Sequence, residues 1–161
     1  MPADDRPVVV AYDGSAEAQA AVRAAATLFT DRTLVIVSIW EPGIAMMMTP
    51  PSSDPTGLAY LPPSPEAMAD MDRAQRDHAE ITAEEGADLA RGLGAAVEPY
   101  PVADEADVAE TVVAVADKRD AAAVVVGSRG LGRVKGRLLG SVSTALLHHT
   151  RRPVLVVRSP D

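Results

Sequence analysis

The chain contains no cysteine, and only 3% of its residues are aromatic. The lack of cysteine excludes a disulfide framework, a zinc-finger site and a thiol nucleophile. The scarcity of aromatic residues means that alanine, valine and leucine must fill the interior. Hydrophobic residues make up 47% of the chain and charged residues 24%, which is ordinary for a soluble globular protein. The composition thus predicts a core of small aliphatic side chains.

Long apolar runs are absent as well. No stretch approaches the ~20 apolar residues that a transmembrane helix needs. The first ten residues, MPADDRPVVV, are acidic and lack the apolar segment of a secretory signal. We therefore expect a cytoplasmic protein. At 161 residues, the chain has the length of a single domain with a sizeable core.

Short apolar runs alternate with segments of helical periodicity along the chain. Runs typical of buried strands are found at 8–11, 33–40, 95–102, 121–126 and 153–157. Helices are predicted between them at 15–30, 66–93, 104–119 and 141–150. This order predicts an α/β fold, a Rossmann-like layer sandwich in which four helices flank a doubly wound, five-stranded parallel sheet. Ligands bind such sheets at the carboxyl ends of the strands, where Asp13, Ile39 and a glycine-rich loop can converge.

Residues 41–65 have a different composition from the rest of the chain. They contain seven prolines and the sequence Met46-Met47-Met48. No regular helix or central strand survives that proline density. We interpret the segment as a variable loop, and its apolar residues leave open whether it is a lid or a surface excursion without a specific role.

The predicted helix at 66–93 has only a weak apolar stripe. Its members are Met68, Met71, Ala74, His78, Ile81 and Leu89. We expect His78 to be partly buried in this stripe rather than to bind a metal, because no second metal ligand lies at helical spacing. Gly86 is expected to loosen the end of the helix.

The stretch from residue 124 to residue 143 reads VVVGSRGLGRVKGRLLGSVS. A strand runs into a glycine-rich loop, and the loop ends where a helix can begin. Such an order builds an anion site, because glycine permits close approach and the N–H groups of a helix start point at the ligand. The charge agrees, because residues 121–161 carry seven Lys or Arg and one acid, whereas residues 1–120 have a balance of −14. A small anion fits this loop, but the acidic remainder would repel a long nucleic acid.

Two common phosphate-binding motifs do not fit this stretch. A Walker A loop would continue Gly127-x4-Gly132 with Lys and Ser or Thr, but Arg133 and Val134 follow here. A dinucleotide fingerprint would need its third glycine one residue before Gly136, and an acidic residue about 20 positions later.

The pattern Gly127-x2-Gly130-x9-Gly140-Ser141 resembles the nucleotide-binding signature of the universal stress protein family. The resemblance extends over nearly the whole chain, from VVVAYDGS at the start through SIWEP and VVVGSRG to RRPVLVV near the end. It implies one universal stress protein domain over residues 1–161, similar to the adenine nucleotide α-hydrolases. The proline-rich segment then falls in the family's variable region.

Carried onto this chain, the resemblance implies an ATP site. Its residues are Ala11, Tyr12 and Asp13 at the adenine and ribose, Ile39 against the adenine, Val126, Gly127, Arg129 and Gly130 beside the ribose and first phosphates, and Gly140, Ser141, Val142 and Ser143 at the terminal phosphates. Unpaired N–H groups at the helix start and the two serine hydroxyls suit that role. Mg²⁺ or Mn²⁺ could bridge the phosphates, although no carboxylate cage lies near the loop.

Simpler roles stay open for three of these residues. Ser141 could cap the helix without a ligand, Asp13 could be a turn residue before Gly14, and Arg129 could be a solvated loop residue.

Our interpretation is an ATP-binding regulator of stress or dormancy that works as a nucleotide-bound switch. Since no general base stands in the loop, we expect at most a slow ATPase. The resemblance adds a homodimer formed through the last strand, 153–157. Two alternatives are a module of the same fold that binds partners without nucleotide, and an ATP-cleaving enzyme of the α-hydrolase group. The latter needs a pyrophosphate-binding loop of serine and glycine near the first strand, and the segment Asp13-Gly14-Ser15 is too slight for such a loop.

Overall fold

The structure is a computed structural model that describes residues 5–43, 63–104, 106–129 and 139–159. Five strands and four helices alternate along this part of the chain, as predicted. The strands are β1 (Val8–Ala11), β2 (Leu34–Trp40), β3 (Val97–Ala103), β4 (Ala123–Gly127) and β5 (Val154–Val157). The helices are α1 (Ala16–Leu28), α3 (Pro65–Gly92), α4 (Val108–Lys118) and α5 (Ser141–His149). Most of the predicted variable loop and residues 130–138 of the glycine-rich loop lie outside the described residues.

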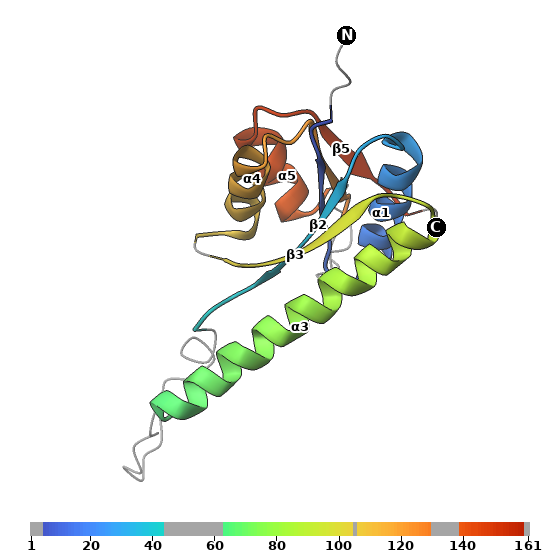
Figure 1. The fold of residues 1–161 in the computed structure, drawn as a ribbon. Helices are drawn as coiled ribbons and strands as arrows, with labels where there is room; N and C mark the ends of the chain where they lie inside the picture. Colours follow the sequence, from blue (N-terminus) through green and yellow to red (C-terminus); the bar gives the residue numbers. More distant parts are fainter. Residues whose placement is uncertain (1–4, 44–62, 105, 130–138, 160–161) are drawn as a thin grey trace.

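All neighbouring strands run parallel, and their order across the sheet is β3-β2-β1-β4-β5. The first half of the chain winds outward from β1 to one edge, and the second half winds from β4 to the other (Figure 1). The predicted doubly wound α/β fold is therefore confirmed. The winding direction switches between β1 and β4, so a ligand crevice is expected at the carboxyl ends of these two strands.

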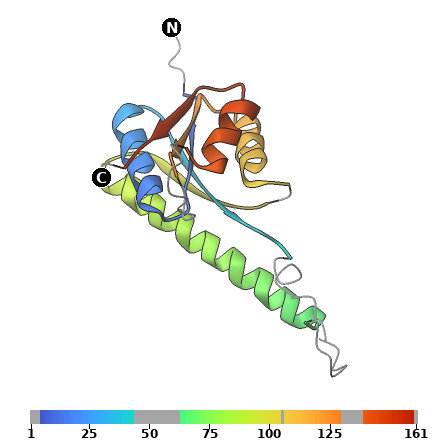
Figure 2. The same ribbon diagram turned by 180° about the vertical axis from the view of Figure 1, so that it is seen from behind.

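Helices cover both faces of the sheet (Figures 1 and 2). The face that carries Val8, Val10 and Ile36 packs against α1 and α3, and the opposite face packs against α4 and α5. The largest fully buried side chains are all leucine, isoleucine or valine. The predicted core of small aliphatic residues is thus what the two layers contain.

Helix α3 is the longest element, with 28 residues. Its amino-terminal turns project beyond the sheet, and its carboxyl-terminal half packs on β2 and β3 (Figure 1). The predicted apolar stripe is wrong for Met71 and Ile81, which are 40% and 59% exposed, and for His78, which is also exposed. Its member Leu89 does pack against the core. The buried face consists of small residues instead, namely Ala79, Thr82, Ala83, Gly86, Ala87 and Ala90.

The reason for this choice of residues is the short distance between α3 and the sheet. A Cβ atom at Gly86 would lie 2.8 Å from Cγ2 of Ile36 and 2.9 Å from Cδ1 of Tyr12, closer than side-chain carbons pack. Gly86 thus does not loosen the helix end but allows this approach.

No helix within the described ranges is both long and apolar enough to cross a membrane.

Candidate functional site

A cavity of about 570 Å³ opens at the carboxyl ends of β1, β2 and β4, at the switch point. Eleven of the twelve site residues predicted from the sequence line it, and the twelfth, Gly130, lies outside the described residues. These eleven are Ala11, Tyr12, Asp13, Ile39, Val126, Gly127, Arg129, Gly140, Ser141, Val142 and Ser143. The fold therefore brings together segments that are more than 100 residues apart in the sequence.

One wall of the cavity is formed by the end of β4 and the start of α5. Gly140 is the N-cap of α5 and has no side chain to cap it, so Ser141 is the first residue of the helix rather than its cap. The first helical hydrogen bond runs from the N–H of Thr144 to the carbonyl of Gly140. Within the described part of the chain, the N–H groups of Ser141, Val142 and Ser143 donate to no acceptor. Three free donors at a helix start favour an anion.

Two hydrogen bonds fasten the start of α5 to the residue after β4. The N–H of Gly140 donates to the carbonyl of Ser128 at 2.6 Å. The hydroxyl of Ser143 donates to the same carbonyl at 3.1 Å, and Ser143 is 1% exposed. The Ser143 hydroxyl thus holds the wall together, which leaves the backbone N–H as its free donor.

Arg129 lies in the same wall, two residues after the end of β4. Its Nε atom is buried and has no hydrogen-bond partner among the described residues. A buried, unpaired donor on a cation is costly unless an acceptor is supplied from outside the chain. Of the described residues, Arg129 is therefore the one whose chemistry most directly calls for an anion.

The two glycines of this wall have different surroundings. A Cβ atom at Gly127 would lie 2.8 Å from the carbonyl carbon and the Cβ of Glu17, at the start of α1. A Cβ atom at Gly140 would have no neighbour closer than 3.4 Å, and the φ angle of Gly140 is an ordinary −72°. Packing therefore explains Gly127, whereas the described structure leaves room for a side chain at Gly140.

The end of β1 forms the floor of the cavity. Oδ1 of Asp13 accepts a hydrogen bond of 3.0 Å from the N–H of Ser15, and Gly14 between them has a φ of +80°. Asp13 is thus a turn residue, and its exposed carboxylate also lines the cavity. Burial raises the pKa of the Tyr12 phenol above its ordinary value of 10.0, and the carboxylates of Glu85 and Asp13 add to the rise.

The opposite wall is formed by the end of β2 and by α3, and Ile39 is its one residue that the sequence predicted as part of the site. Its polar and aromatic members are Ser38, Trp40, Glu41, Gln75, His78 and Thr82. The four-residue face of α3 that lines the cavity consists of Gln75, His78, Ala79 and Thr82. Its spacing of i, i+3, i+4 and i+7 is helical, but only the position of α3 on the sheet shows what it faces.

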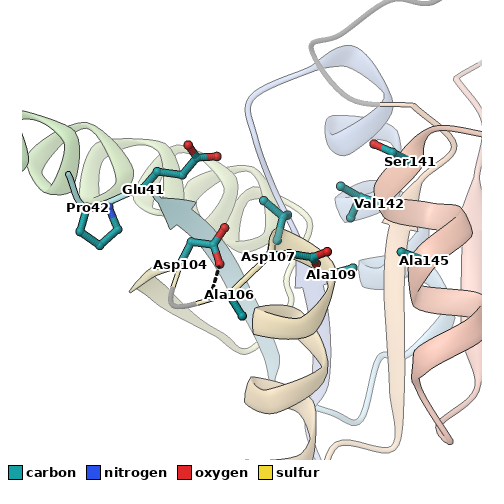
Figure 3. A pocket seen from close by; sticks show the side chains of 10 residues that line it. Glu41, Pro42, Asp104, Ala106, Asp107, Ala109, Ser141, Val142 and Ala145 are labelled. Carbon is teal, nitrogen blue, oxygen red and sulfur yellow. Dashed lines mark hydrogen bonds between the residues drawn. The ribbon is translucent and has the colours of Figure 1, made fainter. Parts of the chain in front are cut away.

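A second hollow of about 560 Å³ adjoins the cavity and shares Glu41, Val108, Ser141 and Val142 with it. Figure 3 shows Glu41 and Asp104 on one side, Ser141 on the other and the start of α4 between them. Asp104 accepts hydrogen bonds from the Ala106 N–H at 3.2 Å and the Thr111 hydroxyl at 2.8 Å. Asp107 caps α4 through the N–H of Glu110 at 3.0 Å. These carboxylates organise the start of α4. The described residues contain no group of three or more His, Cys, Asp or Glu that could hold a metal ion.

Comparison with known proteins supports the resemblance. The chain is 32% identical over 157 residues to the universal stress protein Rv2623 of Mycobacterium tuberculosis, which covers 96% of this chain and 48% of that protein. The chain thus spans about half the length of the curated relatives that it matches over almost all of its residues.

Solved structures share the fold. A universal stress protein in complex with cAMP matches with a TM-score of 0.62 and 25% identity, over 97% of this chain and 98% of that one. The universal stress protein from Archaeoglobus fulgidus in complex with dAMP matches with a TM-score of 0.61 and 21% identity, over 94% and 96%. The model of the universal stress protein family matches residues 6–158. With its doubly wound sheet and the cavity at the switch point, the chain therefore belongs to the universal stress protein family.

Proposed function

We propose that this protein is a cytoplasmic ATP-binding regulator of stress or dormancy, and that it acts as a nucleotide-bound switch with little or slow hydrolysis. The observation that carries the proposal is the buried Nε of Arg129, which has no partner among the described residues and lies in the same wall as three free helix N–H groups. A phosphate chain supplies the acceptors that these donors lack.

The other end of the nucleotide is assigned to the ends of β1 and β2. Ile39 packs with the aliphatic cluster of the α4 and α5 face and also lines the cavity, so it offers an apolar surface to a base. The exposed carboxylate of Asp13 suits the ribose hydroxyls. Two structures of this fold are described as complexes with cAMP and dAMP, which supports an adenine nucleotide as the ligand class.

A switch fits the site better than rapid turnover. Two carboxylates of the adjoining hollow, those of Asp104 and Asp107, already accept hydrogen bonds that organise α4. A carboxylate held in that way is poorly placed to activate water. A divalent ion such as Mg²⁺ or Mn²⁺ would enter with the phosphates, since the described residues offer no protein cage for it.

Thermal unfolding with and without ATP tests the proposal. At about 100 times the dissociation constant, ATP is expected to stabilise the protein by about 2.7 kcal/mol. Gly140→Asp is expected to abolish this shift, because its carboxylate would cap α5 itself and repel phosphate. The same cap keeps the ligand-free variant folded, which makes it a clean comparison. Arg129→Met is expected to weaken ATP binding roughly 10–100-fold but to leave adenosine binding unchanged.

Equal ATP shifts for the wild type and Gly140→Asp would show that the phosphate site has been assigned wrongly. No ATP shift in the wild type, and no adenine nucleotide released from freshly purified protein, would favour the partner-binding module of the same fold.

We also propose that the protein forms a homodimer through β5. The N–H groups of Val124 and Ser128 donate to the carbonyls of Pro153 and Val157. In a parallel sheet, every second residue of an edge strand bonds its neighbour, so the backbone groups of Val154 and Val156 face the open edge. By the same alternation, Pro99 and Pro101 occupy the outward positions of β3 at the other edge, where they offer no N–H. β5 thus presents outward donors along its length, whereas the middle of β3 presents prolines, which favours β5 as the edge that pairs with an additional strand.

Light scattering during size-exclusion chromatography tests the dimer. Twice the chain mass of 16.8 kDa is expected for the wild type. Val156→Pro removes one outward donor without touching the bonds to β4, and it is expected to shift the protein to the monomer. A wild-type monomer at all accessible concentrations would contradict the proposal.

A further inference from the structure

The amino-terminal half of α3 projects beyond the sheet (Figures 1 and 2). None of its residues from 65 to 78 is buried, and Ala79 is the first residue of α3 that is. A helix of this length is marginal in water by itself. Here the hydroxyl of Ser64 caps it, and exposed ion pairs join residues three or four positions apart. The chain thus holds this half of α3 in helical form while leaving it open to contact.

An apolar line of residues runs along an exposed side of α3. We call the five residues of this line the α3 seam: Ala67, Met71, Ala74, His78 and Ile81. All five are exposed, with fractions of 40% at Met71 and 59% at Ile81. They alternate in steps of four and three residues, which is the spacing of the a and d positions in a heptad repeat. That spacing suits a second helix, and the two alanines leave room for its larger side chains.

One flank of the α3 seam is acidic. Asp70, Asp77 and Glu84 occupy the g positions of the same heptads. Exposed arginines pair with two of these carboxylates, but residues 66–92 still carry eight acids and three arginines, a balance of −5. The charges beside a seam decide which helix can pair with it. The α3 seam therefore favours a partner whose flanking residues are basic.

A second copy of α3 fits the α3 seam poorly. In an antiparallel pair of helices, the two acidic rows would face each other. In a parallel pair, each acidic row would face the uncharged positions of the other flank, and two of these, Gln75 and Thr82, line the cavity. Neither arrangement gives the carboxylates a partner of opposite charge. A helix with lysine or arginine beside its own apolar face gives the whole row one.

We infer that the α3 seam is the docking site for a basic amphipathic helix of a partner protein. The apolar face of that helix lies on Met71 and Ile81, and its cations lie on the acidic row. This inference goes beyond the proposed function and does not depend on it, because no residue of the α3 seam is assigned to the nucleotide. His78 belongs to the α3 seam and also lines the cavity, so a helix docked there lies beside the cavity.

Fluorescence anisotropy with a labelled synthetic peptide and the full chain tests the inference. The peptide consists of about three heptads, with leucine at a and d and lysine at e and g, where like charges keep it from pairing with itself. A second peptide has the same composition in scrambled order, so it keeps the charge and loses the apolar face. We expect the heptad peptide to bind roughly tenfold more tightly or better than the scrambled one, because only its leucines are buried together.

The double variant Met71→Gln/Ile81→Gln keeps the charge and the helix propensity of α3 but removes the apolar atoms of the α3 seam. We expect its affinity for the heptad peptide to fall about tenfold or more, with little change in thermal midpoint, since both residues are exposed. Leu28→Gln/Leu147→Gln is the matched control. It makes the same change on α1 and α5, at leucines that are 63% and 49% exposed, and it is expected to bind the peptide as the wild type does.

The acidic row is tested by Asp70→Asn/Asp77→Asn/Glu84→Gln. This variant keeps the apolar atoms of the α3 seam and removes three charges. We expect it to bind the heptad peptide several-fold more weakly than the wild type, and its affinity to fall less steeply as the salt concentration rises. An unchanged salt dependence would show that the peptide binds elsewhere on this acidic protein.

Four further results would contradict the inference. Equal binding of the heptad and scrambled peptides would mean a non-specific attraction to negative charge. Equal affinity of Met71→Gln/Ile81→Gln and the wild type would place the peptide outside the α3 seam. If light scattering shows fewer subunits in that variant than in the wild type, a second copy covers the α3 seam. If the wild type does not bind the heptad peptide, no basic helix docks there, and binding that appears on removal of residues 46–60 would name the chain's own proline-rich segment as the occupant.

Discussion

The two walls of the cavity offer a ligand different kinds of atoms. The wall of β4 and α5 presents backbone N–H groups and one arginine, and its other residues are two glycines, two serines and two valines. The wall of β2 and α3 presents side-chain hydroxyls, an amide, an imidazole and an indole. A backbone site of the first kind binds any group with the charge and size of phosphate, whereas side chains of the second kind can distinguish one uncharged group from another.

The two walls therefore differ in how strongly their binding properties depend on side-chain identity. Backbone donors depend on where α5 begins, so they persist whatever side chains surround them. The side chains of α3 can change without moving the helix, provided that the small residues facing the sheet remain. For the proposed nucleotide, the wall of β4 and α5 thus depends little on side-chain identity, whereas the wall of β2 and α3 depends on it.

The largest effect that we predict concerns a glycine whose role is structural. In Gly127→Ala, the new Cβ would lie 2.8 Å from the backbone carbonyl carbon of Glu17, so α1 must shift away from β4. Overpacking of this kind costs about 1–3 kcal/mol. For a chain of this length, the thermal midpoint is expected to fall by roughly 2–12 °C, measured by circular dichroism without ligand.

Gly140→Ala is the matched control for this prediction, because Gly140 lies in the same wall of β4 and α5 as Gly127. Its Cβ would have no neighbour closer than 3.4 Å, so the ligand-free thermal midpoint is expected to stay within the range of a neutral surface substitution. ATP affinity is expected to fall, since the proposed phosphate occupies the space that the methyl group enters. Equal losses of stability in the two variants would contradict the different roles assigned to these glycines.

The wall of β4 and α5 could be predicted from the sequence because its parts are close together in the chain. A strand, a glycine loop and a helix start follow one another between residues 124 and 143, and local rules for strands, glycine and helix caps apply directly. The doubly wound parallel sheet could also be predicted, since alternating strands and helices leave few parallel topologies. Asp13 and Ile39 then come near the loop because they end neighbouring strands.

The α3 wall could not be predicted, because local patterns favour the wrong face of α3. Met71 and Ile81 look like core residues, but the close approach that Gly86 allows selects alanine and threonine for the buried face. Nor does the sequence reveal that the hydroxyl of Ser143 donates a hydrogen bond to the carbonyl of Ser128. That contact joins two segments across a loop, and it depends on the exact geometry of the turn rather than on residue type.

The smallest effect that we predict concerns Tyr12, which lies on the floor between the two walls and packs against α3 at Gly86. Burial, together with Glu85 and Asp13, raises its pKa in the folded protein, so the folded state holds the phenolic proton more tightly than the unfolded state does. The resulting stability is fully present below pH 10 and is lost as the pH rises above it. Urea denaturation at pH 8 and pH 10.5 is therefore expected to show a smaller free energy of unfolding at the higher pH. Tyr12→Phe is expected to reduce this difference, because phenylalanine keeps the packing on α3 and has no proton to lose. If the difference between the two pH values is the same in Tyr12→Phe as in the wild type, the loss of stability arises from another group and not from Tyr12.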